Sequence, residues 1–121
     1  MPQADPSSFL PISQPMFHVL LSLGAGDKHG WGILKDVDHR SRGKIRLSPG
    51  TLYGIIKRLL DQGLIADSDA RPPRVWDDER RRYYRLTELG RRVVRAEVER
   101  MEETLALVRD TDWASPDPSQ A

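Results

Sequence analysis

Hydrophobic residues recur at helical spacing in four stretches of this chain. The first, from Gln14 to Leu23, has an apolar face so wide that more than one of its sides must be covered. The second begins near His29 and ends before Gly43. Its expected inner face consists of Trp31, Ile33, Leu34 and Val37. These two stretches predict helices that share one small core.

The third stretch, from Ser48 to Gly63, has the clearest boundaries. Ser48 is a favourable N-cap, Pro49 fits the first helical position, and Gly63 fits the position just after the helix. The expected buried stripe consists of Leu52, Ile55, Ile56, Leu59 and Leu60. The opposite face carries no acidic residue before Asp61. This pattern predicts a helix with a basic outer surface.

The fourth stretch predicts a helix from Glu88 to about Arg109, capped by Thr87. Spacings of four, three, four and three residues separate Val94, Val98, Met101, Leu105 and Val108. Such a seam is typical of a coiled-coil contact, although it is too short to identify one by itself. Because this helix lies beyond the compact part of the chain, a second subunit is its simplest partner.

Two stretches have the alternating pattern of strands. Residues 64–66 and 81–86 flank a turn-rich segment and predict a hairpin, which must pack on the helices because two strands alone are weakly stable. Tyr84 is expected to face the core. Residues 44–47 also alternate, which fits a short strand or an extended connection.

The charge distribution is more informative than the net charge of +1. Between His39 and Leu60 every charged residue is basic, whereas acidic residues predominate from Glu97 to Asp112. This asymmetry indicates an anion-binding surface and a separate segment with another role. The 121 residues fit one domain with an appendage, and the Pro- and Ser-rich ends, residues 1–13 and 111–121, predict disordered tails.

Several classes of function lack their sequence signals. The chain has no cysteine, which excludes disulfides and thiolate metal sites and fits a cytoplasmic protein. Neither a secretory signal nor a membrane-spanning run is evident. The three histidines have no zinc spacing, and the adjacent acids at residues 77–79 do not point at one centre. With no phosphate loop or nucleophile motif, we expect no metal, no cofactor and no enzyme activity.

The order of the predicted elements defines a fold class. Three helices, a two-stranded wing and a final helix predict a mainly α fold with a minor α+β component, the winged helix-turn-helix with a C-terminal dimerisation helix. Residues 14–86 would form the DNA-binding domain, and residues 87–110 the dimerisation helix. In this arrangement the third helix enters the major groove of double-stranded DNA.

Candidate DNA contacts follow from this geometry. They are His29, Lys44, Arg46, Ser48, Gly50, Thr51, Tyr53, Gly54, Lys57, Arg58, Arg80 and Arg81. A glycine inside a helix costs about 1 kcal/mol relative to alanine, and Gly50 and Gly54 would permit close approach to DNA. Alternatives remain open: solubility for Lys44 and Arg46, a local helix cap for His29, and pairing with residues 77–79 for the wing arginines.

Three segments of the chain, HGWGILKDV, LSPGTLYGIIKRLLDQGLI and DDERRRYYRLTELGRRV, resemble the PadR-like transcription regulators. The resemblance covers about residues 15–110, and the short final helix is similar to that of the smaller subfamily. It implies a homodimeric regulator, most often a repressor, that binds an inverted-repeat operator. It also implies that the last helix crosses the partner's first helix. The expected dimer contacts are Phe17, Leu20, Leu21, Val94, Val98, Met101, Leu105 and Val108.

Two further points concern partners. Winged-helix regulators often hold a small-molecule effector at the dimer centre, and some PadR-like proteins bind flat aromatic molecules there. Trp31 is expected to be a core residue, and the last helix has no aromatic side chain, so the sequence identifies no effector. The alternative function is a winged helix whose basic face binds an acidic protein.

Overall fold

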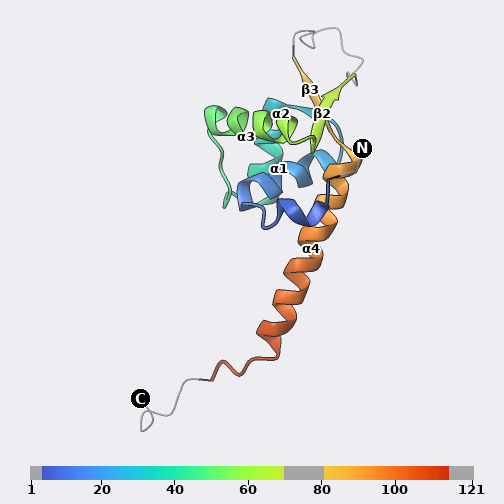
Figure 1. The fold of residues 1–121 in the computed structure, drawn as a ribbon. Helices are drawn as coiled ribbons and strands as arrows, with labels where there is room; N and C mark the ends of the chain where they lie inside the picture. Colours follow the sequence, from blue (N-terminus) through green and yellow to red (C-terminus); the bar gives the residue numbers. More distant parts are fainter. Residues whose placement is uncertain (1–3, 70–80, 115–121) are drawn as a thin grey trace.

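The computed structural model of the protein describes residues 4–69 and 81–114. In chain order its elements are η1 (Pro6–Phe9, a 3-10 helix), α1 (Gln14–Gly24), β1 (Lys28–His29), α2 (Gly30–Arg40), α3 (Pro49–Asp61), β2 (Ile65–Ser68), β3 (Tyr83–Leu86) and α4 (Glu88–Arg109). Figure 1 shows α1, α2 and α3 in a compact body, from which β2 and β3 project at one end and α4 at the other. This is a winged helix with an appended C-terminal helix, as the sequence predicted.

Side-chain caps fix where the helices begin. Ser13, Ser48 and Thr87 precede α1, α3 and α4, and each side-chain oxygen accepts a hydrogen bond from the backbone N–H three residues ahead. At the other end of α3, Gly63 has a φ of 75°, the left-handed conformation that ends helices and favours glycine. The predicted boundaries of α3 and α4 are confirmed.

The sheet contains one strand that the sequence did not predict. Its antiparallel order is β1-β3-β2, and the central strand β3 pairs with β2 from Leu86 opposite Ile65 to Tyr83 opposite Ser68. On the other edge His29 lies opposite Tyr83. A two-residue strand is too short to show an alternating pattern, so the sequence had placed His29 in the opening of a helix. Residues 44–47 form a connection that bends at residues 44 and 45, and not a strand.

The core lies between the three helices of the body, the sheet and the first turns of α4. Its buried members are Val19, Leu20, Leu23, Ile33, Val37, Leu52, Ile56, Leu59, Leu64, Ile65, Tyr84, Leu86 and Val93. Burial of each aliphatic or aromatic side chain contributes about 1.5–3 kcal/mol. Tyr84 faces this core, as predicted, with 3% of its surface exposed.

The first turn of α4 is held against the turn that follows α3. Thr87 N–H donates to the carbonyl of Leu64 at 3.1 Å, and Thr87 Oγ1 donates to the carbonyl of Gly63 at 2.7 Å. A Cβ on Gly90 would lie 2.1 Å from the Leu64 carbonyl oxygen. Only glycine therefore permits this approach of helix and backbone.

Trp31 is not the core residue that the sequence predicted. Its side chain is 54% exposed, whereas Gly30, Ile33 and Val37 are the buried positions of α2. Gly30 is buried beside the ring of Tyr53, and a Cβ there would lie 3.2 Å from the Tyr53 hydroxyl. A glycine thus occupies the inward position that the hydrophobic pattern assigned to tryptophan.

The N-terminal segment also differs from the predicted disordered tail. Asp5 caps η1, and Phe9, Leu10 and Ile12 pack against the core. Ile12 N–H donates to a carboxylate oxygen of Glu97 at 2.7 Å. The segment has few apolar residues, and they lie next to a proline, so the sequence shows no periodic pattern there. The hydrogen-bond partner of Ile12 lies 85 residues away in sequence, so the sequence did not predict this contact.

Gly90→Ala is expected to destabilise the fold by about 1–3 kcal/mol, the usual effect of overpacking, because the added Cβ meets backbone that cannot move aside. Gly50→Ala is the matched control, since a Cβ there meets nothing within 4 Å. Urea denaturation followed by circular dichroism measures both variants. Equal stability of Gly90→Ala and the wild type would contradict the close approach.

Candidate nucleic-acid interface

The outward face of α3 is exposed along its whole length. Every candidate contact on or beside this helix is exposed, namely Ser48, Gly50, Thr51, Tyr53, Gly54, Lys57 and Arg58. The inward face holds the buried stripe, with Leu52, Ile56 and Leu59 fully covered. Within the described part of the chain, Lys57 and Arg58 form no ion pair. Their charges are therefore available to an external anion.

Two glycines on this face have no explanation inside the chain. A Cβ added to Gly50 or Gly54 would meet nothing within 4 Å, so neither glycine is needed for packing. Each nevertheless weakens the helix, and the cost in a helix interior is about 1 kcal/mol relative to alanine. A surface that approaches α3 closely from outside would account for both.

Ser48 and Thr51 are engaged with each other. The Ser48 hydroxyl donates to Thr51 Oγ1 at 2.9 Å and accepts from the Thr51 N–H at 3.2 Å. This pair satisfies one of the free N–H groups at the start of α3. Both residues remain exposed at the end of the helix that carries the positive end of its dipole.

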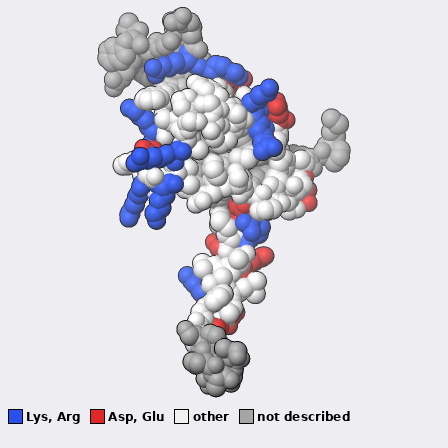
Figure 2. Space-filling model, turned by 90° about the vertical axis from the view of Figure 1, so that its left-hand side faces the viewer, with Lys and Arg blue, Asp and Glu red and all other residues white. Residues whose placement is uncertain are grey.

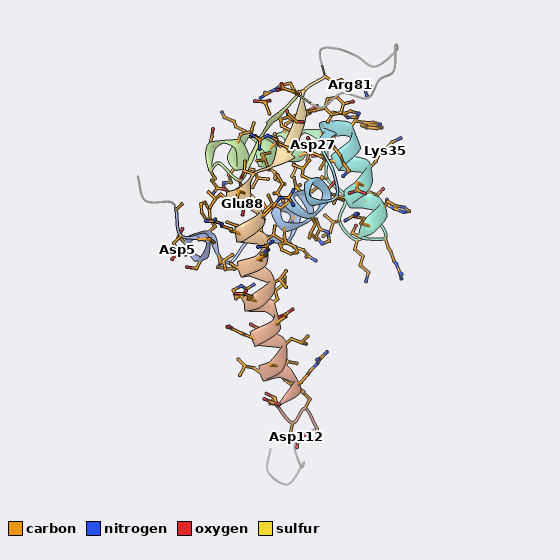
Figure 3. The ribbon with its side chains drawn as sticks, turned by 90° about the vertical axis from the view of Figure 1, so that its right-hand side faces the viewer. Asp5, Asp27, Lys35, Arg81, Glu88 and Asp112 are labelled. Atoms are coloured by element: carbon orange, nitrogen blue, oxygen red, sulfur yellow. The ribbon has the colours of Figure 1, made fainter. Side chains whose placement is uncertain are left out.

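A cleft of about 490 Å³ lies where α2, α3 and the base of the wing meet. Its lining residues are His29, Gly30, Trp31, Tyr53, Arg81, Arg82 and Tyr84. Figure 3 shows Arg81 above α2, on the side of the body that also carries Lys35. Sequence reasoning missed Trp31 as part of this surface. Positions 30, 33, 34 and 37 have helical spacing without Trp31. This alternative pattern could have shown that Trp31 lies outside the core.

His29 caps α2 and also faces this cleft. Its Nδ1 accepts the Gly32 N–H at 3.1 Å, and its ring lies edge-on to Tyr83. A neutral imidazole that accepts at Nδ1 carries its proton on Nε2. Since Nε2 lies 3.2 Å from Arg81 Nη1, two N–H donors converge at one place. The local cap left open by the sequence is thus present, and the other ring nitrogen points toward the cleft's basic edge.

The base of the wing is fixed by an ion pair within the hairpin. Arg82 donates to one Asp67 carboxylate oxygen from Nε at 3.1 Å and from Nη2 at 2.7 Å. The guanidinium also lies 5.4 Å from the centre of the Tyr84 ring. The hydrogen bond to Asp67 raises the pKa of Arg82 above its usual value. Arg80 and the acids at residues 77–79 lie outside the described residues, so Arg81 is the predicted wing contact that the structure places.

A second group of basic side chains lies on α2 and the connection to α3. Lys44 and Arg46 are exposed, and Arg46 Nε lies 3.5 Å from an Asp38 carboxylate oxygen. Such an exposed pair contributes at most about 1 kcal/mol, so it leaves Arg46 able to exchange partners. Figure 2 shows Lys and Arg side chains along the top and one side of the body, whereas acidic and basic groups are mixed along α4.

The predicted dimer contacts fall into three groups that differ in burial. Val94 and Val98 on α4 and Phe17 and Leu21 on α1 are half-buried. Met101, Leu105 and Val108 are 40%, 44% and 42% exposed, and nothing in the described part of the chain covers them. Leu20 is fully buried in the core of its own chain, although it lines the groove between α1 and α4, so its assignment as a dimer contact stays a prediction.

A groove of about 400 Å³ lies between α1 and α4. Its floor is apolar, and Arg40, Arg91 and Arg95 line its sides. The far half of α4 carries Glu99, Glu102 and Glu103, all exposed. The arginines of the groove and these glutamates are complementary in charge. Within one chain they lie apart, because the groove is beside the first half of α4 and the glutamates are on its second half.

The fold and the basic cleft define a winged-helix protein that binds nucleic acid. The chain also matches the model of the Transcriptional regulator PadR-like family over residues 19–96, which is more than half of its length. The protein therefore belongs to the PadR-like family. It is a DNA-binding transcriptional regulator and not an enzyme.

Individual relatives agree with this assignment. Transcriptional regulator Rv3488 of Mycobacterium tuberculosis is 34% identical over 86 residues, which cover 71% of this chain and 74% of the relative. The solved structure of a transcriptional regulator from Clostridium thermocellum has a TM-score of 0.64 at 26% identity, covering 81% of this chain and 95% of that one. A PadR family transcription regulator from Clostridium difficile R20291 shares the fold, with a TM-score of 0.66 at 23% identity over 80% and 96% of the two chains.

Two observations on the described residues complete the site. Residues 4–69 and 81–114 contain no cluster of His, Asp and Glu side chains that could hold a metal ion. No helix in these same ranges is both long enough and apolar enough to cross a bilayer.

Gly54→Ala is expected to stabilise the fold by about 0.5–1 kcal/mol, because alanine favours the helix and its Cβ meets open space. The same change should weaken binding to operator DNA, since the Cβ would intrude on a closely approaching surface. Thermal denaturation and fluorescence anisotropy measure the two effects separately. A more stable variant with unchanged DNA affinity would show that Gly54 does not lie against DNA.

Proposed function

We propose that the protein is a homodimeric cytoplasmic repressor that binds an inverted-repeat operator. Residues 14–86 would form the DNA-binding domain, with α3 in the major groove, and α4 would form the dimer contact. The observation that carries the DNA-binding geometry is the exposed face of α3, which has no acidic residue before Asp61 at its end. On this face Lys57 and Arg58 form no ion pair with the described residues. Membership of the PadR-like family supports repression as the direction of regulation.

The cleft beside α3 suits the DNA backbone. A phosphate oxygen accepts readily from the guanidinium of Arg81, which lies beside His29 at this cleft, and such contacts fix the register of a protein on DNA. The exposed ring of Trp31 would then lie against the adjoining sugar. Lys44 and Arg46 would contact phosphates at the other end of α3, while the face with Tyr53, Gly54 and Lys57 would meet the base edges.

The dimer would bring the two α3 helices about 34 Å apart, the distance between successive major grooves. We expect α4 of one protomer to cross α1 of the other, because this covers the exposed Met101, Leu105 and Val108. In that arrangement the acidic half of α4 can approach the partner's groove between α1 and α4, which is lined by arginines. Apolar burial would supply the stability, and the opposite charges would set the orientation.

Replacing Lys57 and Arg58 together with alanine is expected to weaken operator binding and to flatten its salt dependence. If both residues contact phosphates in each protomer of the dimer, four contacts are lost, and the slope of log K against log salt should fall by about 3–4, because each contact contributes about 0.9. The control is Arg109→Ala, which removes an exposed charge at the far end of α4. Fluorescence anisotropy titrations across salt concentrations measure both, on an operator obtained by selection from genomic DNA.

An unchanged slope and affinity would remove α3 from the interface. Failure to select any DNA, together with co-purification of an acidic protein, would support the alternative of a protein-binding winged helix. Recovery of an inverted repeat would support the dimeric arrangement as well as DNA binding.

Leu105→Glu is expected to dissociate the dimer at micromolar concentration, because it places a charge in the centre of the apolar seam. Leu107→Glu is the matched control, since Leu107 is 69% exposed and lies off the seam. Light scattering coupled to gel filtration gives the mass of each variant. A monomeric wild type, or equal dissociation by both variants, would contradict the proposed interface.

A further inference from the structure

Residues 4–12, named here the N-terminal strap, run along the first turns of α4. At the start of the strap Ala4 shares a small cavity with Glu88, Leu89 and Arg92 of α4. At its end Ile12 donates its N–H to Glu97. Figure 3 shows Asp5 beside the upper part of α4, whereas Asp112 lies at the far end. The strap therefore covers only the part of α4 nearest the body.

Glu97 is the last buried residue of α4. Its side chain is 2% exposed, and every residue of the helix from Glu99 onward is exposed. One carboxylate oxygen accepts the Ile12 N–H at 2.7 Å, and the other accepts from the Arg100 guanidinium. Burial by itself raises the pKa of Glu97, but the hydrogen bonds from Arg100 and Ile12 outweigh it, and the pKa is lowered. The carboxylate is thus held ionised at the point where α4 extends beyond the body of its own chain.

Because Glu97 lies where α4 extends beyond the body, a small rotation there would move the far end of the helix. The part of α4 beyond Glu97 is about 18 Å long at 1.5 Å per residue. A rotation of about 10° at Glu97 would move the end of the helix by about 3 Å over that length. That displacement is close to the 3.4 Å rise of one base pair along a DNA strand.

We infer that the strap and Glu97 are positioning elements that set the angle of α4 and thereby the separation of the two recognition helices. The inference rests on the proposed dimer, in which α4 connects one α3 to the other. Neither the strap nor Glu97 lies in the segment that matches the family model, residues 19–96. Under this inference the strap selects among half-site spacings without touching DNA.

The absence of cysteine from the chain permits a direct distance measurement. Asp61→Cys, at the exposed end of α3, accepts one spin label per protomer, and pulsed dipolar spectroscopy then gives the distance between the two labels. We expect a narrow distribution in the otherwise wild-type chain. Deletion of residues 1–11 and, separately, Glu97→Ala should each broaden or shift it by about 3 Å or more.

Two variants test the specificity of this effect. Glu99→Ala removes an exposed acid two residues away and should leave the distribution unchanged. Glu97→Gln keeps an acceptor for the Ile12 N–H and should fall between the wild type and Glu97→Ala. In operator titrations the wild type should discriminate against half-sites moved by one base pair, and the strap deletion should lose most of that discrimination.

The outcomes separate the two proposals. A dipolar signal with the same distance distribution in all variants would overturn the role of the strap and leave the dimer intact. The lack of any dipolar signal in the labelled wild type would overturn the dimer itself. If the deletion variant does not fold, as judged by circular dichroism, the distribution of Glu97→Ala decides.

Discussion

The structure depends on one backbone contact, where the first turn of α4 lies on the turn that follows α3. Gly90 is the residue that permits it, because any side chain would meet the Leu64 carbonyl. Hydrogen bonds from Thr87 to Gly63 and Leu64 hold the same point. Since β2 begins at Ile65, the end of α3, the start of the wing and the start of α4 are fixed to each other.

This contact relates the proposed DNA-binding face to the proposed dimerisation helix. Figure 1 shows the wing and the free half of α4 projecting from opposite ends of the body. A DNA-binding face and a dimerisation face can therefore act together only if the angle between them is constant. The backbone contact at Gly90 supplies one fixed point, and the hydrogen bond between Ile12 and Glu97 supplies a second one further along α4.

Several residues have a structural role and a binding role at once. His29 uses Nδ1 to cap α2 and directs Nε2 toward Arg81. Ser48 begins α3 and stays exposed beside the proposed path of the DNA. Gly54, by contrast, has no structural role, because it weakens its helix and no packing contact of the described residues requires a glycine there. A capping role therefore does not argue against a DNA contact.

The sequence by itself determined the elements whose causes are local. The caps at Ser48 and Thr87, the terminal Gly63 and the buried stripe of α3 depend on interactions within a few residues, so the helix boundaries and the winged-helix order could be read directly. The comparison with the family then established the class of function. The assignment of individual residues to DNA or to the dimer remains a prediction.

Only the tertiary structure decided the features whose partners lie far away along the chain. The strand β1 exists because β3 offers it an edge, and the position of α2 against the core leaves Trp31 exposed while Gly30 is buried beside Tyr53. The strap is ordered because Glu97, 85 residues from Ile12, accepts its N–H. Short segments with few apolar residues carry no periodic signal, so their order depends on contacts that form only when distant parts of the chain meet.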